Sequence, residues 1–413
     1  MSIAAPRRYL EALFQAAVKA ADPMVRLPRF LPPRPKGRLI VIGAGKASAR
    51  MAETLEKHYG PCDGLVITRY GYERPTKGIE IASAAHPVPD QAAIEATRRL
   101  LDLVSDLTPD DLVIALISGG GSALLCAPSD GVTLADKMNL TSQLLACGAT
   151  ISEINTVRQT LSLVKGGQLA AACAPARVLS LLISDVPGDD PALIASGPTV
   201  PSTTTAKQAL ALIEKWGLDV PAHVLDAMQR YNSATMSLEH CETHIIAAPS
   251  QSLAAAAVTA GDVDVHILGD AIEGEARDVA RAHADLALQM QRRGLQRPAV
   301  ILSGGECTVT RTGTGIGGPN AEYVLAAALA LDGATGIHVL VADTDGVDGA
   351  DEIAGAYAGP NTLTTARALG IDALDALKNN DAHTFFKSLG AQVITGPTLT
   401  NVNDFRAILI HKA

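Results

Sequence analysis

The sequence has few aromatic residues, no basic excess and no long uncharged hydrophobic run. Only 3% of its 413 residues are aromatic, and the formal net charge is −9. This charge excludes a nucleic-acid surface or an anionic membrane as the main partner, because both require a basic face. No stretch reaches the roughly 18 apolar residues of a membrane span, and the N-terminus lacks the apolar run of a secretory signal. These absences predict a soluble, cytoplasmic protein.

Paired cysteines are also missing. The six cysteines form no C-x-x-C pair, and no cluster of histidines accompanies them. This argues against a structural zinc site and a disulfide framework. We therefore expect reduced cysteines, most of them in the core, in a reducing compartment.

The first half of the chain has the pattern of a parallel α/β fold. Short apolar runs at 38–43, 64–68, 111–118 and 177–184 predict buried strands, and Asp90 predicts the N-cap of an intervening helix. Strands that alternate with helices form a parallel sheet covered on both faces. We expect a Rossmann-like α/β domain here.

A second, smaller α/β domain is predicted to follow. At roughly 100 to 200 residues per domain, the length favours two domains. The stretch 232–244 lacks periodicity and indicates a boundary, so the predicted domains span 1–236 and 237–413. Strands of the second domain are expected at 243–248, 265–269, 299–305, 337–343 and 405–410.

Three predicted strands end in glycines followed or flanked by polar residues. These are the segments 43–46 (GAGK), 118–122 (SGGGS) and 303–306 (SGGE). Glycine lets backbone N–H groups approach an anion, and a following helix N-terminus adds a favourable dipole. A plain strand-to-helix turn is the alternative for any one of them. Together they predict an anion site built from Gly45, Lys46, Ser118, Gly119, Gly120, Gly121, Ser122 and Glu306.

The first of these loops does not match a dinucleotide fingerprint. Ser48 stands where the third glycine is expected, and the next predicted strand ends in Arg69, with no acid to bind a ribose. A Walker A loop is absent as well. Lys46 follows two glycines at the start of a predicted helix, where a cation can bridge phosphate oxygens. An exposed first-turn lysine is the alternative.

Two acidic segments provide candidate carboxylates. Residues 184–190 hold Asp185, Asp189 and Asp190 on a Pro-Gly turn, and residues 343–348 hold Asp343, Asp345 and Asp348. Carboxylates at strand ends can bind Mg²⁺ or accept a hydroxyl proton. An ordinary surface turn is the alternative for the first segment, and a solvated loop for the second.

A basic segment and one histidine complete the candidates. Arg158 and Lys165 stand seven residues apart on a helix predicted within 153–168, so we expect both on one face, where they could bind carboxylate or phosphate. The alternative is a solvated basic stripe. His86, which precedes a proline, is predicted to be structural.

Nine blocks of the sequence resemble one known family. In order they are VIGAGKAS (41–48), AAHPVPD (84–90), SGGGSALL (118–125), NTVRQTLSLVKGG (155–167), SDVPGDDPALIASGPT (184–199), LSGGECTVT (302–310), GGPNAE (317–322), DTDGVDG (343–349) and TLTNVNDFRAILI (398–410). Together they resemble the class II glycerate kinases, which have an N-terminal glycerate kinase domain and a C-terminal MOFRL domain. The resemblance covers essentially the whole chain.

The resemblance implies an activity and several roles. Members use ATP and a divalent metal, here taken as Mg²⁺, and phosphorylate glycerate to 2-phosphoglycerate. The family's essential lysine falls on Lys46, and its essential aspartate falls among Asp185, Asp189 and Asp190, with Asp189 favoured. Many relatives read GGRNQE where this chain reads GGPNAE, which keeps Asn320 but loses an arginine. Arg311 or Arg158 is the hypothetical replacement for that arginine.

The predicted mechanism places the active site in the cleft between the two domains. Lys46 and the SGGGS loop hold phosphates, Asp189 and Asp345 hold Mg²⁺, and Arg158 or Lys165 holds the glycerate carboxylate. One rival is an NAD(P)H-dependent hydroxypyruvate reductase, a label that some tartrate-pathway members of the family carry. A non-catalytic sugar-phosphate sensor is the other. The sequence leaves open whether two copies form a homodimer.

Overall fold

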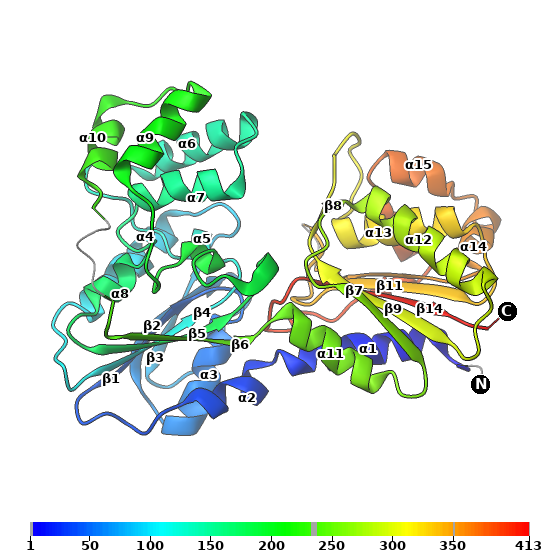
Figure 1. The fold of residues 1–413 in the computed structure, drawn as a ribbon, viewed down its shortest axis with the longest axis horizontal. Coiled ribbons are helices and arrows are strands. Elements are labelled where there is room, and N and C mark those ends of the chain that lie inside the picture. Colours follow the sequence, from blue (N-terminus) through cyan, green and yellow to red (C-terminus); the bar gives the residue numbers. More distant parts are fainter. Residues whose placement is uncertain (1–2, 233–237, 350–351, 413) are drawn as a thin grey trace. The chain divides into compact units, whose positions relative to one another are not determined.

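The computed structural model describes residues 3–232, 238–349 and 352–412. The chain divides into two compact units (Figure 1). Unit 1 comprises Met1–Val25, Asp185–Gly188 and Ala247–Ala413, and unit 2 comprises Arg26–Ser184 and Asp189–Ile246. Residues 3–25 and 185–188 therefore belong with the C-terminal part of the chain. The predicted boundary between residues 236 and 237 lies outside the described residues.

Within the described residues, unit 2 is built on a six-stranded sheet with the order β3-β2-β1-β4-β5-β6. The neighbours from β3 to β5 pair in parallel. Both β1 and β4 are buried along their whole length, as their uninterrupted apolar sequences predict. The strands are β1 (Leu39–Ala44), β2 (Asp63–Arg69), β3 (Ile79–Ala84), β4 (Leu112–Ile117), β5 (Arg177–Ile183) and β6 (Cys241–Ala247).

Helices cover this sheet and form a separate group beside it. The helices are α2 (Pro23–Arg26), α3 (Ser48–Tyr59), α4 (Gln91–Leu103), α5 (Gly121–Leu124), α6 (Leu134–Ala146), α7 (Ile151–Thr160), α8 (Gln168–Ala172), α9 (Ala206–Trp216) and α10 (Ala222–Arg230), with short 3₁₀ helices at Leu27–Phe30, Pro187–Asp189 and Ile194–Ser196. Asp90 caps α4 as predicted, accepting from the amide of Ala93 at 3.0 Å. Helices α6, α7, α9 and α10 pack around a hydrophobic cluster of their own. In Figure 1 these four helices form one group.

The strand order of unit 2 determines where a ligand can bind. From β1 the chain proceeds outward through β2 and β3, and then returns to the other side of β1 as β4. In open α/β sheets ligands bind beyond the carboxyl ends of the strands at such a switch point. The loops after β1 and β4, which hold Lys46 and residues 118–121, meet there.

Unit 1 contains a mixed sheet with the order β13-β12-β11-β14-β9-β7 among the described residues. Only β7 and β9 pair in parallel; the other neighbours are antiparallel. The strands are β7 (Asp264–Gly269), β9 (Ala299–Gly305), β11 (Ile337–Asp343), β12 (Gly355–Ala358), β13 (Gln392–Val393) and β14 (Asp404–Ile410), and β8 (Gly274–Glu275) pairs separately with β10 (Cys307–Thr308).

Helices pack on both faces of this second sheet. Side chains of β14 alternate between two cores, with Phe405, Ala407 and Leu409 on one side and Ile408 and Ile410 on the other. In Figure 1, α12 and α13 lie over one face, and α1 and α11 over the opposite face. The helices are α1 (Pro6–Ala20), α11 (Pro249–Thr259), α12 (Ala276–Arg292), α13 (Pro319–Leu331), α14 (Thr362–Ala368), α15 (Ala373–Lys378) and α16 (Ala382–Ser388).

The structure corrects one predicted strand. The segment 243–248 was expected in the second sheet, but β6 is the edge strand of the first sheet, next to β5. A backbone hydrogen bond from Val178 to His240 joins the two segments. The sequence suggested that this strand belongs to the second domain, because the aperiodic stretch before it resembles a domain boundary. The second sheet begins instead with β7.

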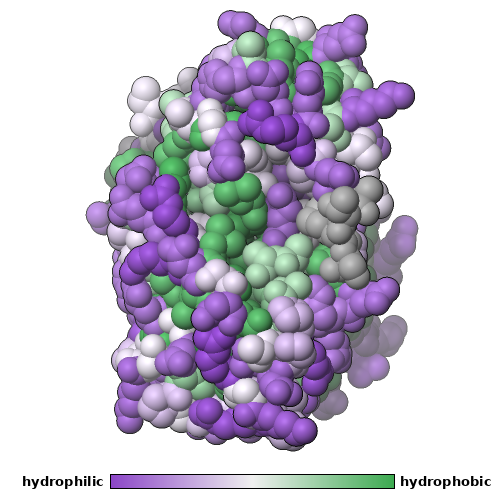
Figure 2. Space-filling model, turned by 90° about the vertical axis from the view of Figure 1, so that its left-hand side faces the viewer, coloured by the Kyte–Doolittle hydropathy of each residue, from purple (hydrophilic) through white to green (hydrophobic). Residues whose placement is uncertain are grey.

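Among the described helices none is long and apolar enough to span a membrane. All six cysteines are free, and four of them are buried. Figure 2 shows a face where hydrophobic residues form a central band bordered by hydrophilic ones.

Candidate functional site

The loops after β1 and β4 are built against each other. Helix α3 begins directly after Gly45 and Lys46, and three amides at its start are bonded internally. The amide of Lys46 donates to the carbonyl of Gly119 at 2.9 Å, and that of Ser48 to Gly45 at 3.2 Å. The amide of Ala47 donates to Oγ of Ser118 at 3.0 Å. The N-terminus of α3 is therefore occupied by the neighbouring loop, which leaves these amides unable to bind an anion.

In the loop after β4, two backbone amides are available to a ligand. In the described part of the chain, no group accepts from the amides of Gly119 and Gly120. Gly120 has a φ of 79°, a backbone region that disfavours other residues. A Cβ atom there would lie 3.0 Å from Nε2 of His86 and 3.2 Å from Cγ of Lys46. Two available amides, a lysine and a histidine thus meet at one point, which suits a phosphate group.

Arg158 and Lys165 converge on the same loop, though not as predicted. Helix α7 ends at Thr160, so the two residues do not share a helix face. The amides of Val164 and Lys165 bond to Oγ of Ser162 in a turn that ends the helical pattern. The turn brings Nζ of Lys165 to 2.6 Å from the carbonyl oxygen of Ser122, and Nη2 of Arg158 lies 3.4 Å from the same oxygen.

A third cation, Lys137 on α6, lies beside these two. Its Nζ donates to the carbonyl of Leu161 at 3.1 Å. The cavity that Lys137, Arg158 and Lys165 line has a volume of about 490 Å³, and Ser122 and Cys126 form part of its wall. We call it the cationic pocket. Among the described residues no carboxylate pairs with any of the three cations.

Burial of these cations lowers their proton affinity. Burial, with the charges of Arg158 and Lys137 added to it, holds the pKa of Lys165 well below its usual range. Burial lowers the pKa of Lys137 to about 8 and also lowers the pKa of Arg158. Buried charges without partners destabilise a fold unless a ligand compensates them.

The three aspartates of the first acidic segment have different surroundings. Asp185 lies in unit 1, where its Oδ2 accepts from Nδ2 of Asn401 at 3.3 Å. Asp190, in unit 2, accepts from the amide of Ala192 at 2.9 Å and so shapes the turn. Asp189 has a positive φ of 56°, and its buried Oδ1 has no hydrogen-bond partner in the described structure. Strain and an unsatisfied carboxylate oxygen together are typical of a functional residue.

The second acidic segment is a buried loop of unit 1. Asp343 accepts from the amide of Asp345, and Asp345 from that of Val347, both at 2.8 Å. Asp345 and Asp348 are at most 1% exposed, which contradicts a solvated loop. Asp348 accepts from the amides of Asn320 and Ala321 at the start of α13. Burial nevertheless raises its pKa to about 8.

Asn320 belongs to the same buried network. Its Nδ2 donates to Oδ1 of Asp404 at 2.7 Å, and Arg406 donates to Oδ2 of Asp404 at 2.9 Å. His383 lies 3.3 Å from Oδ2 of Asp348. Glu306, by contrast, is exposed at the end of β9. Of the predicted residues in unit 1, Asn320 and Asp348 therefore meet in one network.

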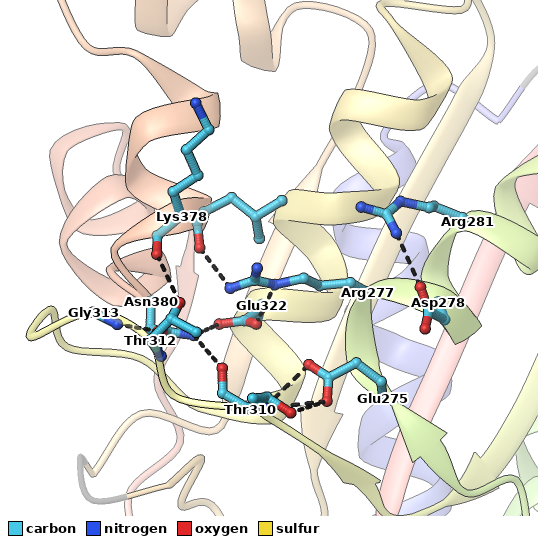
Figure 3. A network of polar contacts seen from close by, with 11 residues as sticks. Glu275, Arg277, Asp278, Arg281, Thr310, Thr312, Gly313, Glu322, Lys378 and Asn380 are labelled. Carbon is cyan, nitrogen blue, oxygen red and sulfur yellow. Dashed lines mark hydrogen bonds and ion pairs between the residues drawn. The ribbon is translucent and has the colours of Figure 1, made fainter.

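The glycine-rich segment before α13 is fixed by a second network, drawn in Figure 3. Oδ1 of Asn380 accepts from the amides of Thr312 and Gly313, and its Nδ2 donates to Glu322 at 3.0 Å. Glu322 also pairs with Arg277 at 2.6 Å. The segment is thus rigidly held. Arg311 donates to the carbonyl of Gly315, and no phosphate contact is assigned to it.

Two residues of unit 2 were missed by sequence reasoning. Lys137 stands alone in an amphipathic helix, and only the fold brings it beside Arg158 and Lys165. His86 was predicted to be structural, yet it lies beside Gly120 and Lys46. The strand β3, which ends two residues before His86, was not among the predicted strands, so the sequence analysis had no signal that placed His86 at this edge of the sheet.

Comparison with known domain families assigns both parts of the chain. Residues 9–229 match the "Domain of unknown function (DUF4147)" family, and residues 299–404 match the MOFRL family. The first match alone covers more than half of the 413 residues.

Related proteins carry two different names. A relative from Agrobacterium vitis with a hydroxypyruvate reductase name is 49% identical, over 98% of this chain and 94% of that protein. The D-glycerate 2-kinase of Thermotoga maritima is 40% identical, over 98% of this chain and 96% of its own length. A crystal structure of a Thermotoga maritima glycerate kinase aligns with a TM-score of 0.90 at 38% identity, covering 98% of this chain and 99% of that one. The chain therefore belongs to the glycerate kinase family, with a DUF4147 domain and a MOFRL domain.

Proposed function

We propose that this protein transfers the γ-phosphoryl group of ATP to the 2-hydroxyl of glycerate, which yields ADP and 2-phosphoglycerate. The observation that carries the proposal is the meeting of Lys46 with the amides of Gly119 and Gly120 at the switch point of the unit 2 sheet. Oriented amides and a lysine are the groups that stabilise a phosphoryl group in transfer. Glycerate kinase relatives along the whole chain support the same reaction.

Phosphoryl transfer depends mainly on positioning and on neutralisation of charge. The glycerate hydroxyl oxygen forms a bond to the γ-phosphorus while the bond to the β–γ bridging oxygen breaks. Lys46 and the two glycine amides would hold phosphoryl oxygens and offset the negative charge. Asp189, whose Oδ1 is buried without a partner in the described structure, would accept the hydroxyl proton.

The donor set also fits Mg²⁺ as a substrate-bound ion. Mg²⁺ commonly takes one or two carboxylates and completes its shell with phosphate oxygens and water. In the described residues no group of three or more His, Cys, Asp or Glu could hold a metal alone. The second carboxylate oxygen of Asp189 would then be an oxygen ligand for the ion, and the ion would supply charge neutralisation. The joint role of Asp189 and Asp345 in holding the ion stays a prediction, as does the cleft between the domains.

The hydroxypyruvate reductase name of two relatives makes that activity the second candidate. The strand order matches that of a dinucleotide-binding sheet, which favours it. However, a dinucleotide pyrophosphate binds the amides that follow the first strand, and those of Lys46, Ala47 and Ser48 are bonded within the protein. This local geometry favours the kinase.

One assay with two arms tests the choice. We expect ADP release that depends on glycerate, and no NADH or NADPH oxidation with hydroxypyruvate. Coupling the product to enolase without phosphoglycerate mutase should give phosphoenolpyruvate, because enolase accepts only the 2-phospho isomer. A strict requirement for the mutase would contradict the 2-hydroxyl assignment. Nicotinamide oxidation without ADP release would reverse the choice, and no turnover in either arm would favour a sensor.

Asp189→Asn tests the role of the carboxylate. We expect kcat to fall by about 100-fold or more, with KM changed far less, since a proton acceptor acts only in the transition state. Asp190→Asn is the matched control, because Asp190 is used by a backbone turn. An effect of Asp189→Asn on KM alone would make it a substrate-binding residue.

A further inference from the structure

The cationic pocket contains more positive charge than the fold compensates. Lys137, Arg158 and Lys165 line one cavity, and among the described residues their side chains donate hydrogen bonds to carbonyl and hydroxyl oxygens. Within the described residues none of them has a carboxylate partner. A charge that is removed from water without a counter-charge destabilises the fold. The pocket is therefore incomplete without an anion.

Donors of the pocket remain available for that anion. Lys165 is 1% exposed and uses its Nζ on Ser122 and Leu125, so it contributes charge and supports the loop. Lys137 uses one of its three N–H groups on Leu161, and Arg158 makes one long hydrogen bond of 3.4 Å. Lys137 and Arg158 are thus the residues that can contact a ligand directly.

Part of the pocket lining is apolar and exposed, and we call this part the apolar wall. Val88, Met138, Leu145 and Ile151 line it and are 42% to 65% exposed, although they are large hydrophobic residues. A single carboxylate or free phosphate would leave this wall uncovered. A ligand with a polyanionic end and a flat, weakly polar end would cover both the cations and this wall. The volume of about 490 Å³ is also within the range of small-molecule and cofactor sites and exceeds the needs of a three-carbon acid.

Two residues of the pocket lining are neighbours, along the chain, of residues at the phosphate site. Ser122 lines the pocket and follows Gly121 in the chain, and Pro87 lines it directly after His86. An extended ligand can therefore reach from the apolar wall to the amides of Gly119 and Gly120 beside Lys46.

We propose that the cationic pocket binds the nucleotide, with its base on the apolar wall and its phosphates on Lys137 and Arg158. This inference rests on the proposed kinase function. It replaces the sequence-based hypothesis that Arg158 or Lys165 binds the glycerate carboxylate. Lys165 is a positioning residue, because it acts through Ser122. The terminal phosphate then lies at the glycine amides and Lys46.

Direct binding to the full-length protein tests this inference without turnover. The probes are the non-hydrolysable ATP analogue AMP-PNP and inorganic tripolyphosphate, measured by calorimetry without glycerate. Lys137→Met should weaken binding of both probes by about tenfold or more, because it removes a charge-assisted contact. Met138→Gln combined with Leu145→Gln should weaken AMP-PNP about fivefold and leave tripolyphosphate unchanged, because only the base needs the apolar wall.

Lys207→Met is the matched control, since it removes a lysine from an exposed position of α9 in the same unit. It should change both dissociation constants by less than about twofold. Circular dichroism and thermal unfolding establish that each variant is folded. Unchanged AMP-PNP binding in folded Lys137→Met would overturn the proposal. A rise in the KM for glycerate with unchanged AMP-PNP binding would return the pocket to glycerate.

The outcomes separate this inference from the proposed function. If the protein phosphorylates glycerate but Lys137→Met leaves AMP-PNP binding unchanged, the pocket assignment is refuted and the kinase function stands. AMP-PNP binding that depends on Lys137, without glycerate phosphorylation, would refute the kinase and keep the nucleotide pocket. Equal losses of AMP-PNP and tripolyphosphate in the Met138→Gln, Leu145→Gln variant would refute the placement of the base.

Discussion

Units 1 and 2 both contain clusters of buried or partly buried charged groups, but the two clusters differ in their partners. In unit 2, Lys137, Arg158 and Lys165 share a pocket without a carboxylate partner among the described residues. In unit 1, Asp404 is buried against Arg406, and Asp348 accepts two amides at the start of α13. In the described structure the cluster of unit 2 lacks a counter-charge, whereas in unit 1 Asp404 is paired with the cation Arg406 and Asp348 with two backbone amides.

The pKa directions show the same contrast. Burial lowers the pKa of Lys137 and of Lys165. The positive charges of Arg158 and Lys137 lower the pKa of Lys165 further. Burial raises the pKa of Asp404, while Arg406 counteracts that rise. A buried charge with a partner indicates structure, whereas a buried charge without one indicates a ligand. The sequence patterns of the two regions had suggested equal functional roles.

Removal of the cation that pairs with Asp404 in unit 1 should have the largest effect on stability. Arg406→Met leaves Asp404 buried without its cation, and we expect a loss of about 3–5 kcal/mol in the free energy of unfolding. Urea denaturation measures it. Arg281→Met is the control, because the Arg281–Asp278 pair is exposed and should contribute less than about 1 kcal/mol. Equal effects of the two variants would remove the contrast between paired and exposed charges.

A change at the phosphate site of unit 2 should instead lower activity. Lys46→Ala is expected to lower kcat about 100-fold or more, because it removes a cation from the phosphate site. Thermal unfolding should change little, since Lys46 lies in the turn before α3 and is not part of the hydrophobic core. Lys207→Ala serves as the exposed control. A folded Lys46→Ala variant with normal kcat would contradict the site.

Gly120→Ala should have a mixed effect. The positive φ and the close approach to His86 and Lys46 predict a loss of about 1–2 kcal/mol in unfolding free energy. Activity should fall by more than stability alone explains, because the added methyl group lies where phosphate would bind. Gly217→Ala is the control for strain, since it also has a positive φ but open space around it. Equal activity in both variants would argue against a ligand at Gly120.

The smallest expected effect is a gain in stability. Lys137→Met should raise the free energy of unfolding of the ligand-free protein by about 1 kcal/mol at pH 7, because it removes a desolvated charge. In the folded wild-type protein the pKa of Lys137 is about 8, below the ordinary value of 10.5. Between pH 8 and pH 10.5 the unfolded chain therefore binds more protons than the folded protein. Wild-type stability should therefore rise from pH 8 to 10.5, and this rise should be smaller in the variant. Urea titrations across this range measure it, and an identical slope in both proteins would contradict the buried charge.

Sequence reasoning located most elements whose pattern is local. The apolar runs at 111–118 and 177–184 became β4 and β5, and the helical pattern after residue 204 became α9 and α10. The short strands β12 and β13 were not predicted, because two to four residues carry too little periodicity. The helix within 153–168 was predicted too long, since the turn at Ser162 depends on a side-chain bond that apolar spacing does not reveal.

The sequence by itself determined the α/β class, the glycine loops, the family and the candidate Lys46, because each depends on neighbouring residues. Only the tertiary structure decided that β6 closes the first sheet, that Asp348 and Asn320 stabilise a buried network, and that the amides after β1 are occupied. It also brought Lys137, Arg158 and Lys165 to one cavity from separate segments. The physical reason is that burial and charge pairing are set by contacts between distant segments, which spacing along the chain does not encode.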